Sequence, residues 1–252
     1  MNYRCSPNGA THTRGVGEQD ALFLEALLRR NLRSVEPGAR LLELGAPHHE
    51  IHVIIEGWAM RRKVMPNGTY QIVALHLPGD ICEFNALLGS ASDTEVMAIN
   101  TVRAATISAR MLNEMAQRPR LSRALWMEAM ASGSIQRQWF ANIAYHNASR
   151  RVAHLICEFA HRLDQVGQTK HLPDVDSLVF ACPLTQYHLG NATAMSVEHT
   201  NRTLAQLKKS FGLHTRGGVM KIGQLGKMQE FCHFSPGYIT LEIQTHPIVP
   251  HS

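Results

Sequence analysis

The sequence is poor in the features that mark secreted, metal-bound or membrane-spanning proteins. Its five cysteines are scattered and form no CxxC pair, which argues against a disulfide framework or a zinc site and for a reducing compartment. No apolar run is long enough to span a bilayer. The N-terminus lacks the basic-then-apolar pattern of a secretory signal. We therefore expect a cytoplasmic protein without a membrane partner.

Common catalytic motifs are missing as well. The chain contains no nucleophile elbow, no phosphate-binding P-loop, no HExxH motif and no glycine-rich dinucleotide loop. These absences argue against an enzyme, although a site made of two carboxylates has no local signature and stays open. With 44% hydrophobic and 18% charged residues, the 252-residue chain is globular. Its net charge of +5 is compatible with a polyanionic partner.

Residues 183–222 have the pattern of a helix-turn-helix followed by a wing. Thr185 and Ser196 are placed to cap the two helices, because a hydroxyl at this position accepts from an orphan backbone N–H. Small and apolar residues recur at helical spacing on one face of the second helix, at Thr200, Thr203, Leu204 and Leu207. Its other face is polar, which suits insertion into a major groove. Two core helices with a surface hairpin are the alternative.

The wing is predicted at residues 214–222. Gly217 and Gly218 stand at its centre, and paired glycines permit the positive φ angles of a tight hairpin turn. We expect a winged helix-turn-helix domain over residues 147–235, followed by a tail at residues 236–252. Within this domain we also predict a polar link at residues 167–181.

The first half of the chain has the period of β-strands. Residues 1–17 are polar and are expected to form a flexible tail, and residues 18–118 a β-rich domain that opens with a short helix. Alternation predicts five strands, at residues 40–44, 52–56, 59–64, 70–77 and 102–107. Asn67-Gly68 is a hairpin signal between two of them. Short strands at this spacing predict a sandwich or barrel.

A long apolar helix is predicted at residues 119–146, between the two halves. Few charges interrupt its apolar positions, so it needs a partner. A second copy of the same helix is the simplest one and would make it a dimerisation helix. Burial against the chain's own β-domain is the alternative.

This order of elements resembles the Crp/Fnr family of bacterial transcription regulators over residues 22–231. The resemblance rests on VIIEGWAMRRKVMPNGTYQIVALHLPGD at residues 53–80 and LTQYHLGNATAMSVEHTNRTLAQL at residues 184–207. It implies an α+β fold with an N-terminal cyclic-nucleotide-binding-type β-roll, a kind of jelly roll, and a C-terminal winged domain. It also implies a sequence-specific regulator, by default an activator, that acts as a homodimer on double-stranded DNA and contacts RNA polymerase.

The resemblance assigns roles in the second helix of the motif. The family places a Glu and, four residues later, an Arg toward the groove, and Glu198 and Arg202 match these positions. A Glu carboxylate accepts from cytosine N4, and an Arg forks onto guanine O6 and N7. Val197 and Asn201 share this face. Val197 stands where the cyclic-AMP-receptor branch has a basic residue, so the chain is closer to the Fnr and FixK branch, which implies a two-fold TTGA-type site.

A surface ion pair between Glu198 and Arg202 is the alternative to base reading. Contacts that fix the register on the DNA backbone are expected from six further residues: Thr185, Gln186, Ser196, His199, Arg216 and Lys221.

The β-domain departs from the family's effector pattern. Cyclic-nucleotide-binding members hold a Gly-Glu pair and, about ten residues later, an Arg that neutralises the phosphate. Here Glu83 and the pair Asp93-Thr94 stand near these positions as a candidate effector pocket, and residues 78–102 contain no Arg or Lys. We therefore predict that cyclic AMP does not bind in the family's manner. The cations at 61–63, Arg61, Arg62 and Lys63, are expected to be solvated, although they could face the cavity.

No cofactor is predicted. Only Cys5 and Cys82 precede the long helix, and two thiolates cannot supply the four ligands of an iron–sulfur cluster. Haem is not expected but stays open, because the β-domain contains His48, His49, His52 and His76. Cys182 is a redox candidate, since its oxidation beside the DNA could weaken binding. A packed small residue is the alternative there.

Two other functions remain open from the sequence. The chain could be a small-molecule-binding β-domain or enzyme with an accessory helical interaction domain. It could also be an interaction module whose winged domain binds a protein. Salt dependence separates these from DNA binding, which weakens steeply with salt through counterion release.

Overall fold

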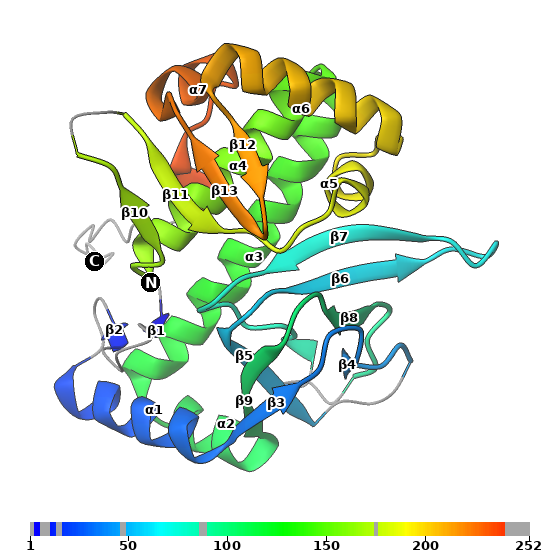
Figure 1. Cartoon of the computed structure of the whole chain (residues 1–252). Helices are drawn as coiled ribbons and strands as arrows, with labels where there is room; N and C mark the ends of the chain where they lie inside the picture. The colour runs from blue at the N-terminus through cyan, green and yellow to red at the C-terminus, as the bar shows by residue number, and fades with distance from the viewer. Residues whose placement is uncertain are drawn as a thin grey trace, which may run out of the picture.

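The chain folds into a β-rich N-terminal part and a C-terminal part of helices and short strands, joined by a long helix (Figure 1). The computed structural model describes residues 17–45, 49–85, 90–173 and 176–239, and the backbone of β1 (Tyr3–Cys5) and β2 (Thr11–Thr13). These two strands lie in the segment predicted as a tail. The haem candidate His48, the Cys5 side chain and residues 240–252 lie outside the described residues.

The alternating residues form two antiparallel sheets. One has the order β3 (Leu32–Val35), β9 (Val102–Ser108) and β5 (Glu50–Glu56). The other has the order β4 (Arg40–Leu42), β8 (Glu95–Ala98), β6 (Ala59–Val64) and β7 (Tyr70–His76). Side chains of both sheets share one buried cluster that includes Ile54, Ala59 and Val96. The predicted β-roll is thus confirmed.

The strands follow the sequence signals except where alternation is weak. The five predicted strands are present within two residues of their expected ends, and Gly68 adopts a φ of 80° in the hairpin between β6 and β7. The sequence did not indicate β3 or β8. In β8 three of the four residues are buried, so its side chains show no period of two.

Four helices surround and connect the sheets. They are α1 (Glu18–Arg30), α2 (Ala109–Ala116), α3 (Pro119–Tyr145) and α4 (Ala148–Gln165). Pro119 starts α3, where its missing N–H has no intrahelical partner to lose. The sequence did not indicate α2. Among the described ranges, no helix combines the length and apolar composition that a bilayer crossing requires.

The C-terminal part contains the predicted motif and an unexpected sheet. Its helices are α5 (Gln186–Ala192), α6 (Val197–Phe211) and α7 (Leu225–Phe231). Its four strands run in the order β10 (Thr169–His171), β11 (Leu178–Ala181), β13 (Val219–Ile222) and β12 (His214–Arg216). The predicted wing hairpin is therefore β12 and β13. The link predicted at residues 167–181 contains two strands, because its apolar residues pair with β13.

The boundary of the predicted tail also needs a correction. The 3₁₀ helix η2 (Pro236–Tyr238) packs on the domain: the Tyr238 hydroxyl donates to the Glu158 carboxylate at 2.9 Å, and Ile239 is buried. The two apolar residues Tyr238 and Ile239 did not by themselves indicate a packed segment, and the prolines of this region indicated a loose tail.

Gly190 allows α5 and α6 to approach closely. A Cβ atom there would lie 2.6 Å from Thr200 Oγ1 and 2.9 Å from the Met195 carbonyl oxygen. We expect Gly190→Ala to lower the free energy of unfolding by about 1–3 kcal/mol, because the second neighbour is backbone and cannot turn away. Urea denaturation measures the loss. Gly237→Ala, whose Cβ meets nothing within 4 Å, is the control, and equal stability of the two variants would contradict the packing argument.

Candidate nucleic-acid interface and β-domain interior

Local capping fixes where the two helices of the motif begin and end. The Thr185 hydroxyl accepts from the His188 N–H at 3.2 Å, and the His188 ring accepts from the Thr185 N–H at the same distance. The Ser196 hydroxyl accepts from the His199 N–H at 3.2 Å and so starts α6. Gly212, with a φ of 65°, ends it. Caps of this kind satisfy backbone groups that no helical partner can reach.

The buried face of α6 leaves its polar face in solvent. Thr200, Thr203, Leu204, Leu207 and Phe211 are buried, as the helical spacing predicts. The four residues assigned to base reading are all exposed: Val197, Glu198, Asn201 and Arg202. Between Glu198 and Arg202 the structure records no ion pair, so both charges stay available to a ligand.

The six residues assigned to the DNA backbone are exposed too. Thr185, Gln186, Ser196 and His199 lie at the starts of α5 and α6, where helix N-termini favour anions. Arg216 and Lys221 lie on β12 and β13 of the wing. The structure thus places all ten predicted side chains at the surface of one winged helix-turn-helix motif.

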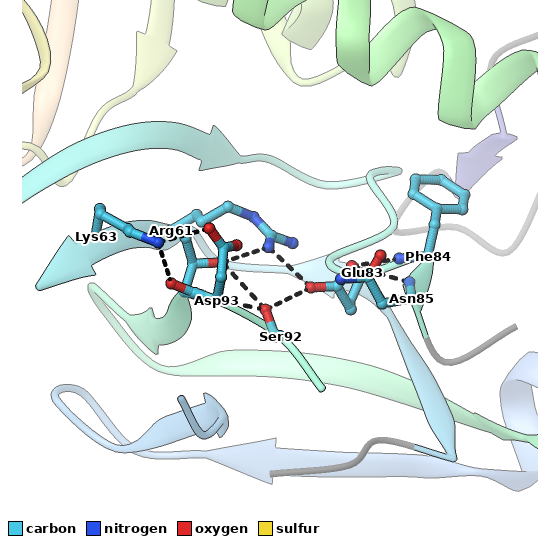
Figure 2. Close-up of polar contacts among 8 residues, drawn as sticks. Arg61, Lys63, Glu83, Phe84, Asn85, Ser92 and Asp93 are labelled. Carbon is cyan, nitrogen blue, oxygen red and sulfur yellow. Dashed lines mark hydrogen bonds and ion pairs between the residues drawn. The ribbon is translucent and has the colours of Figure 1, made fainter. Parts of the chain in front are cut away.

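The interior of the β-domain contains an ion pair that the sequence argument did not place. Arg61 on β6 donates to Glu83 at 2.9 Å and to the Thr94 hydroxyl at 2.8 Å (Figure 2). Glu83 also accepts from the Ser92 hydroxyl at 2.8 Å and from the backbone N–H groups of Phe84 and Asn85. The side chains of Arg61 and Glu83 are only 12% and 6% exposed. The expectation of a solvated Arg61 was therefore wrong.

The charge of Glu83 is held by its neighbours. Burial raises the pKa of the carboxyl group, but the Arg61 cation and hydrogen bonds from the Asn85 N–H, Arg61 and Ser92 outweigh it, so the pKa lies below its usual range. Arg61 comes two residues after the fully buried Ala59. The alternation of the strand was the signal that could have placed it inside.

Asp93 lies apart from the other two candidate pocket residues. Its carboxylate is 79% exposed and pairs with Lys63 at 2.5 Å (Figure 2), whereas Glu83 and Thr94 converge on Arg61. Asp93 therefore does not share an interior pocket with Glu83 and Thr94, as the sequence had suggested. The interior cation Arg61 already has a carboxylate partner of its own.

Of the candidate thiols and imidazoles that the structure describes, Cys82, Cys182, His52 and His76 are buried, and His49 is exposed. Burial raises the pKa of Cys182 to about 11, and the pKa of Cys82 is also raised, mainly by burial. A protonated thiol is a poor nucleophile, so a redox role for Cys182 has no support here. His52 contacts Arg33 and Thr106. Within the described ranges, no group of three or more His, Cys, Asp or Glu side chains could hold a metal ion.

One face of α3 is covered and the other is bare. Leu121, Ala124 and Leu125 pack in a cluster with α1 and β9, so burial against the β-domain accounts for one face of the helix. On the other face Trp126, Met130 and Phe140 are 67%, 62% and 75% exposed. Large apolar side chains in solvent indicate a contact surface.

Comparisons with known proteins agree with this geometry. Residues 32–119 match the cyclic nucleotide-binding domain, and residues 150–231 match the Crp-like helix-turn-helix domain. The fumarate and nitrate reduction regulatory protein of Vibrio cholerae is 22% identical over 87% of this chain and 85% of that protein. The anaerobic regulatory protein of Haemophilus influenzae is 22% identical over 90% and 85%. Among solved structures, FixK2 from Bradyrhizobium japonicum superposes with a TM-score of 0.67 at 20% identity, covering 79% of this chain and 95% of that one.

Proposed function

Because the chain belongs to the Crp/Fnr family of DNA-binding transcription regulators, we propose that it binds a two-fold TTGA-type site as a homodimer and activates transcription by contacting RNA polymerase in the cytoplasm. The observation that carries the proposal is the bare polar face of α6, with Glu198 and Arg202 exposed at its first turns. Residues four apart share a helical face, so both side chains enter one major groove together. The candidate effector pocket does not favour the alternative of a small-molecule-binding β-domain or enzyme, since Arg61, Glu83 and Ser92 bond one another there.

In this proposal the exposed apolar face of α3 is the surface through which two copies of the chain form the homodimer. Trp126, Met130, Gly133, Arg137 and Phe140 follow one another at alternating spacings of four and three residues, which is the spacing of a coiled-coil seam. Gly133 has no bulk there, and a Cβ atom would meet only the Arg137 guanidinium. Two such helices side by side would bury the exposed aromatic residues, and a two-fold dimer would present one α6 helix to each half-site.

The experiment uses purified, metal-free protein, a two-fold TTGA-type duplex and a scrambled duplex of the same composition. Selective binding without added ligand, weakening steeply as salt rises, supports the proposal. Light scattering on the same sample should give the mass of two chains. Equal, weak binding to both duplexes at every salt concentration would contradict it.

Cyclic AMP should change neither the thermal midpoint of the protein nor its affinity for DNA. Arg61 is a buried cation inside the β-roll, and Glu83 and Thr94 already bind it. A nucleotide phosphate would therefore have to break a buried ion pair before it gained Arg61 as a partner. Thermal unfolding with millimolar cyclic AMP measures this. A clear upward shift of the midpoint would show that the pair opens for a nucleotide.

A further inference from the structure

β7 is an edge strand whose free edge faces the DNA-binding domain (Figure 1). On one side it pairs with β6, from Val64 opposite Tyr70 to Ala59 opposite His76. On its other side none of the strands that the structure describes is hydrogen-bonded to it. A free strand edge presents backbone N–H and C=O groups that need partners, and here the partners are side chains of another domain.

The side-chain amide of Asn191, at the end of α5, occupies this edge in the manner of a peptide group. Its Nδ2 donates to the Tyr70 carbonyl at 2.9 Å, and its Oδ1 accepts from the Ile72 N–H at 2.5 Å. Tyr70 C=O and Ile72 N–H are the two groups that the next strand of a sheet would bind. One carboxamide therefore satisfies both of them.

Neighbouring contacts reinforce this junction. The Gln71 side chain donates to the Asn191 carbonyl oxygen. The Tyr70 ring meets the Tyr187 ring of α5 edge-on at 6.1 Å and lies under the Arg62 guanidinium at 4.6 Å. The β-roll hairpin and the first helix of the DNA-binding motif are thus joined by backbone, amide and aromatic contacts.

A second contact, made by Arg162 in the last turn of α4, also joins the DNA-binding domain to β7. Arg162 donates to the Leu75 carbonyl at 3.3 Å and pairs with Asp80, and it also binds Glu158 at 3.1 Å. Both Arg162 and Glu158 are buried. Two attachment points along one strand restrict rotation of the DNA-binding domain about the axis through either of them.

We propose that Asn191 is a positioning residue that splices α5 onto the free edge of β7 and so holds the helix-turn-helix in one orientation on the β-domain without a ligand. This rests on the proposed DNA-binding function. The junction uses the end of α5, whereas Glu198 and Arg202 on α6 stay exposed, so the attached state leaves the base-reading face open. Loss of the attachment would let the domain populate other orientations, and affinity falls in proportion to the fraction in the competent one.

The test compares full-length wild-type protein with Asn191→Ala and Asn191→Asp. The alanine variant removes both hydrogen bonds. The aspartate variant keeps an acceptor for the Ile72 N–H but sets a carboxylate against the Tyr70 carbonyl. Asn113→Ala, which removes an exposed amide on α2, is the matched control. Hydrogen exchange of the β7 amides and affinity for the TTGA-type duplex are measured on all four proteins.

We expect the Ile72 amide to exchange faster in Asn191→Ala, with an about tenfold loss of affinity for the duplex. The exchange rate and affinity of Asn191→Asp should lie between those of Asn191→Ala and wild type. Both quantities should be the same in Asn113→Ala as in wild type. Unchanged exchange, or faster exchange with unchanged affinity, overturns the positioning role. If wild type fails to select the duplex, the proposed function fails, and the exchange of Ile72 still decides whether Asn191 joins the two domains.

Discussion

Replacing Arg61 with alanine is expected to lower the free energy of unfolding by about 3–5 kcal/mol. The Arg61 guanidinium is the one charged partner recorded for the buried Glu83 carboxylate among the described residues. Without it the carboxylate keeps three hydrogen bonds but loses the cation that offsets its desolvation. Urea denaturation followed by circular dichroism measures the difference.

Lys63→Ala is the matched control for this experiment. Lys63 lies on the same strand and also forms an ion pair, but its partner Asp93 is 79% exposed, and exposed pairs contribute at most about 1 kcal/mol. The double variant Arg61→Leu with Glu83→Leu should recover most of the loss, because neither charge then remains unpaired. An Arg61→Ala protein as stable as Lys63→Ala would show that the interior pair contributes nothing.

The same pair predicts how stability depends on pH. The pKa of Glu83 is lower in the folded protein than its ordinary value of 4.5, so the unfolded state binds the proton first as pH falls. The stabilisation is present above pH 4.5 and is lost as pH falls through the folded-state pKa. The wild-type protein should therefore lose stability in this acid range, and Arg61→Ala should lose less.

The second large effect is expected at the DNA. Arg202→Ala should reduce affinity for the specific duplex by about 1–3 kcal/mol and relax the preference at one G·C pair, because the guanidinium fork to guanine is lost. Binding to scrambled DNA should change less. Competition titrations with duplexes that vary at each position of the half-site measure both quantities.

Arg110→Ala controls for the loss of one positive charge. Arg110 is 89% exposed on α2 of the β-domain and pairs with Glu114 at 3.4 Å. Its removal should leave specific binding within experimental error. If Arg202→Ala keeps both the affinity and the base preference of the wild-type protein, α6 does not read the site through Arg202.

Local signals were enough to find the elements of the DNA-binding motif. Thr185 and Ser196 indicate where the two helices start, because a hydroxyl just before a helix accepts a hydrogen bond from a backbone N–H that has no helical partner. Gly217-Gly218 indicates a hairpin turn, because such a turn depends only on the backbone conformation of these two residues. These effects act over a few residues, so they are visible in one sequence, and their order along the chain carries the family resemblance.

Local patterns were not enough where the partner of a strand or side chain lies far along the chain. β11 pairs with β13 across some forty residues of chain, and its sequence was taken for part of a link because its polar surroundings dominate the segment. Arg61 was assigned to solvent because charge usually predicts exposure. In both cases the deciding partner is distant in sequence, as Glu83 is for Arg61.

The sequence by itself determined the class of fold, the order of the main elements and the exposure of the residues proposed to face the DNA, since these follow from periodicity, capping and residue chemistry. Only the tertiary structure decided that Arg61 pairs with Glu83 inside the β-roll and that Asn191 binds the edge of β7. Both depend on pairing side chains 22 and about 120 residues from their partners. Such pairings are selected by the packing of whole sheets and helices, and no local pattern records them.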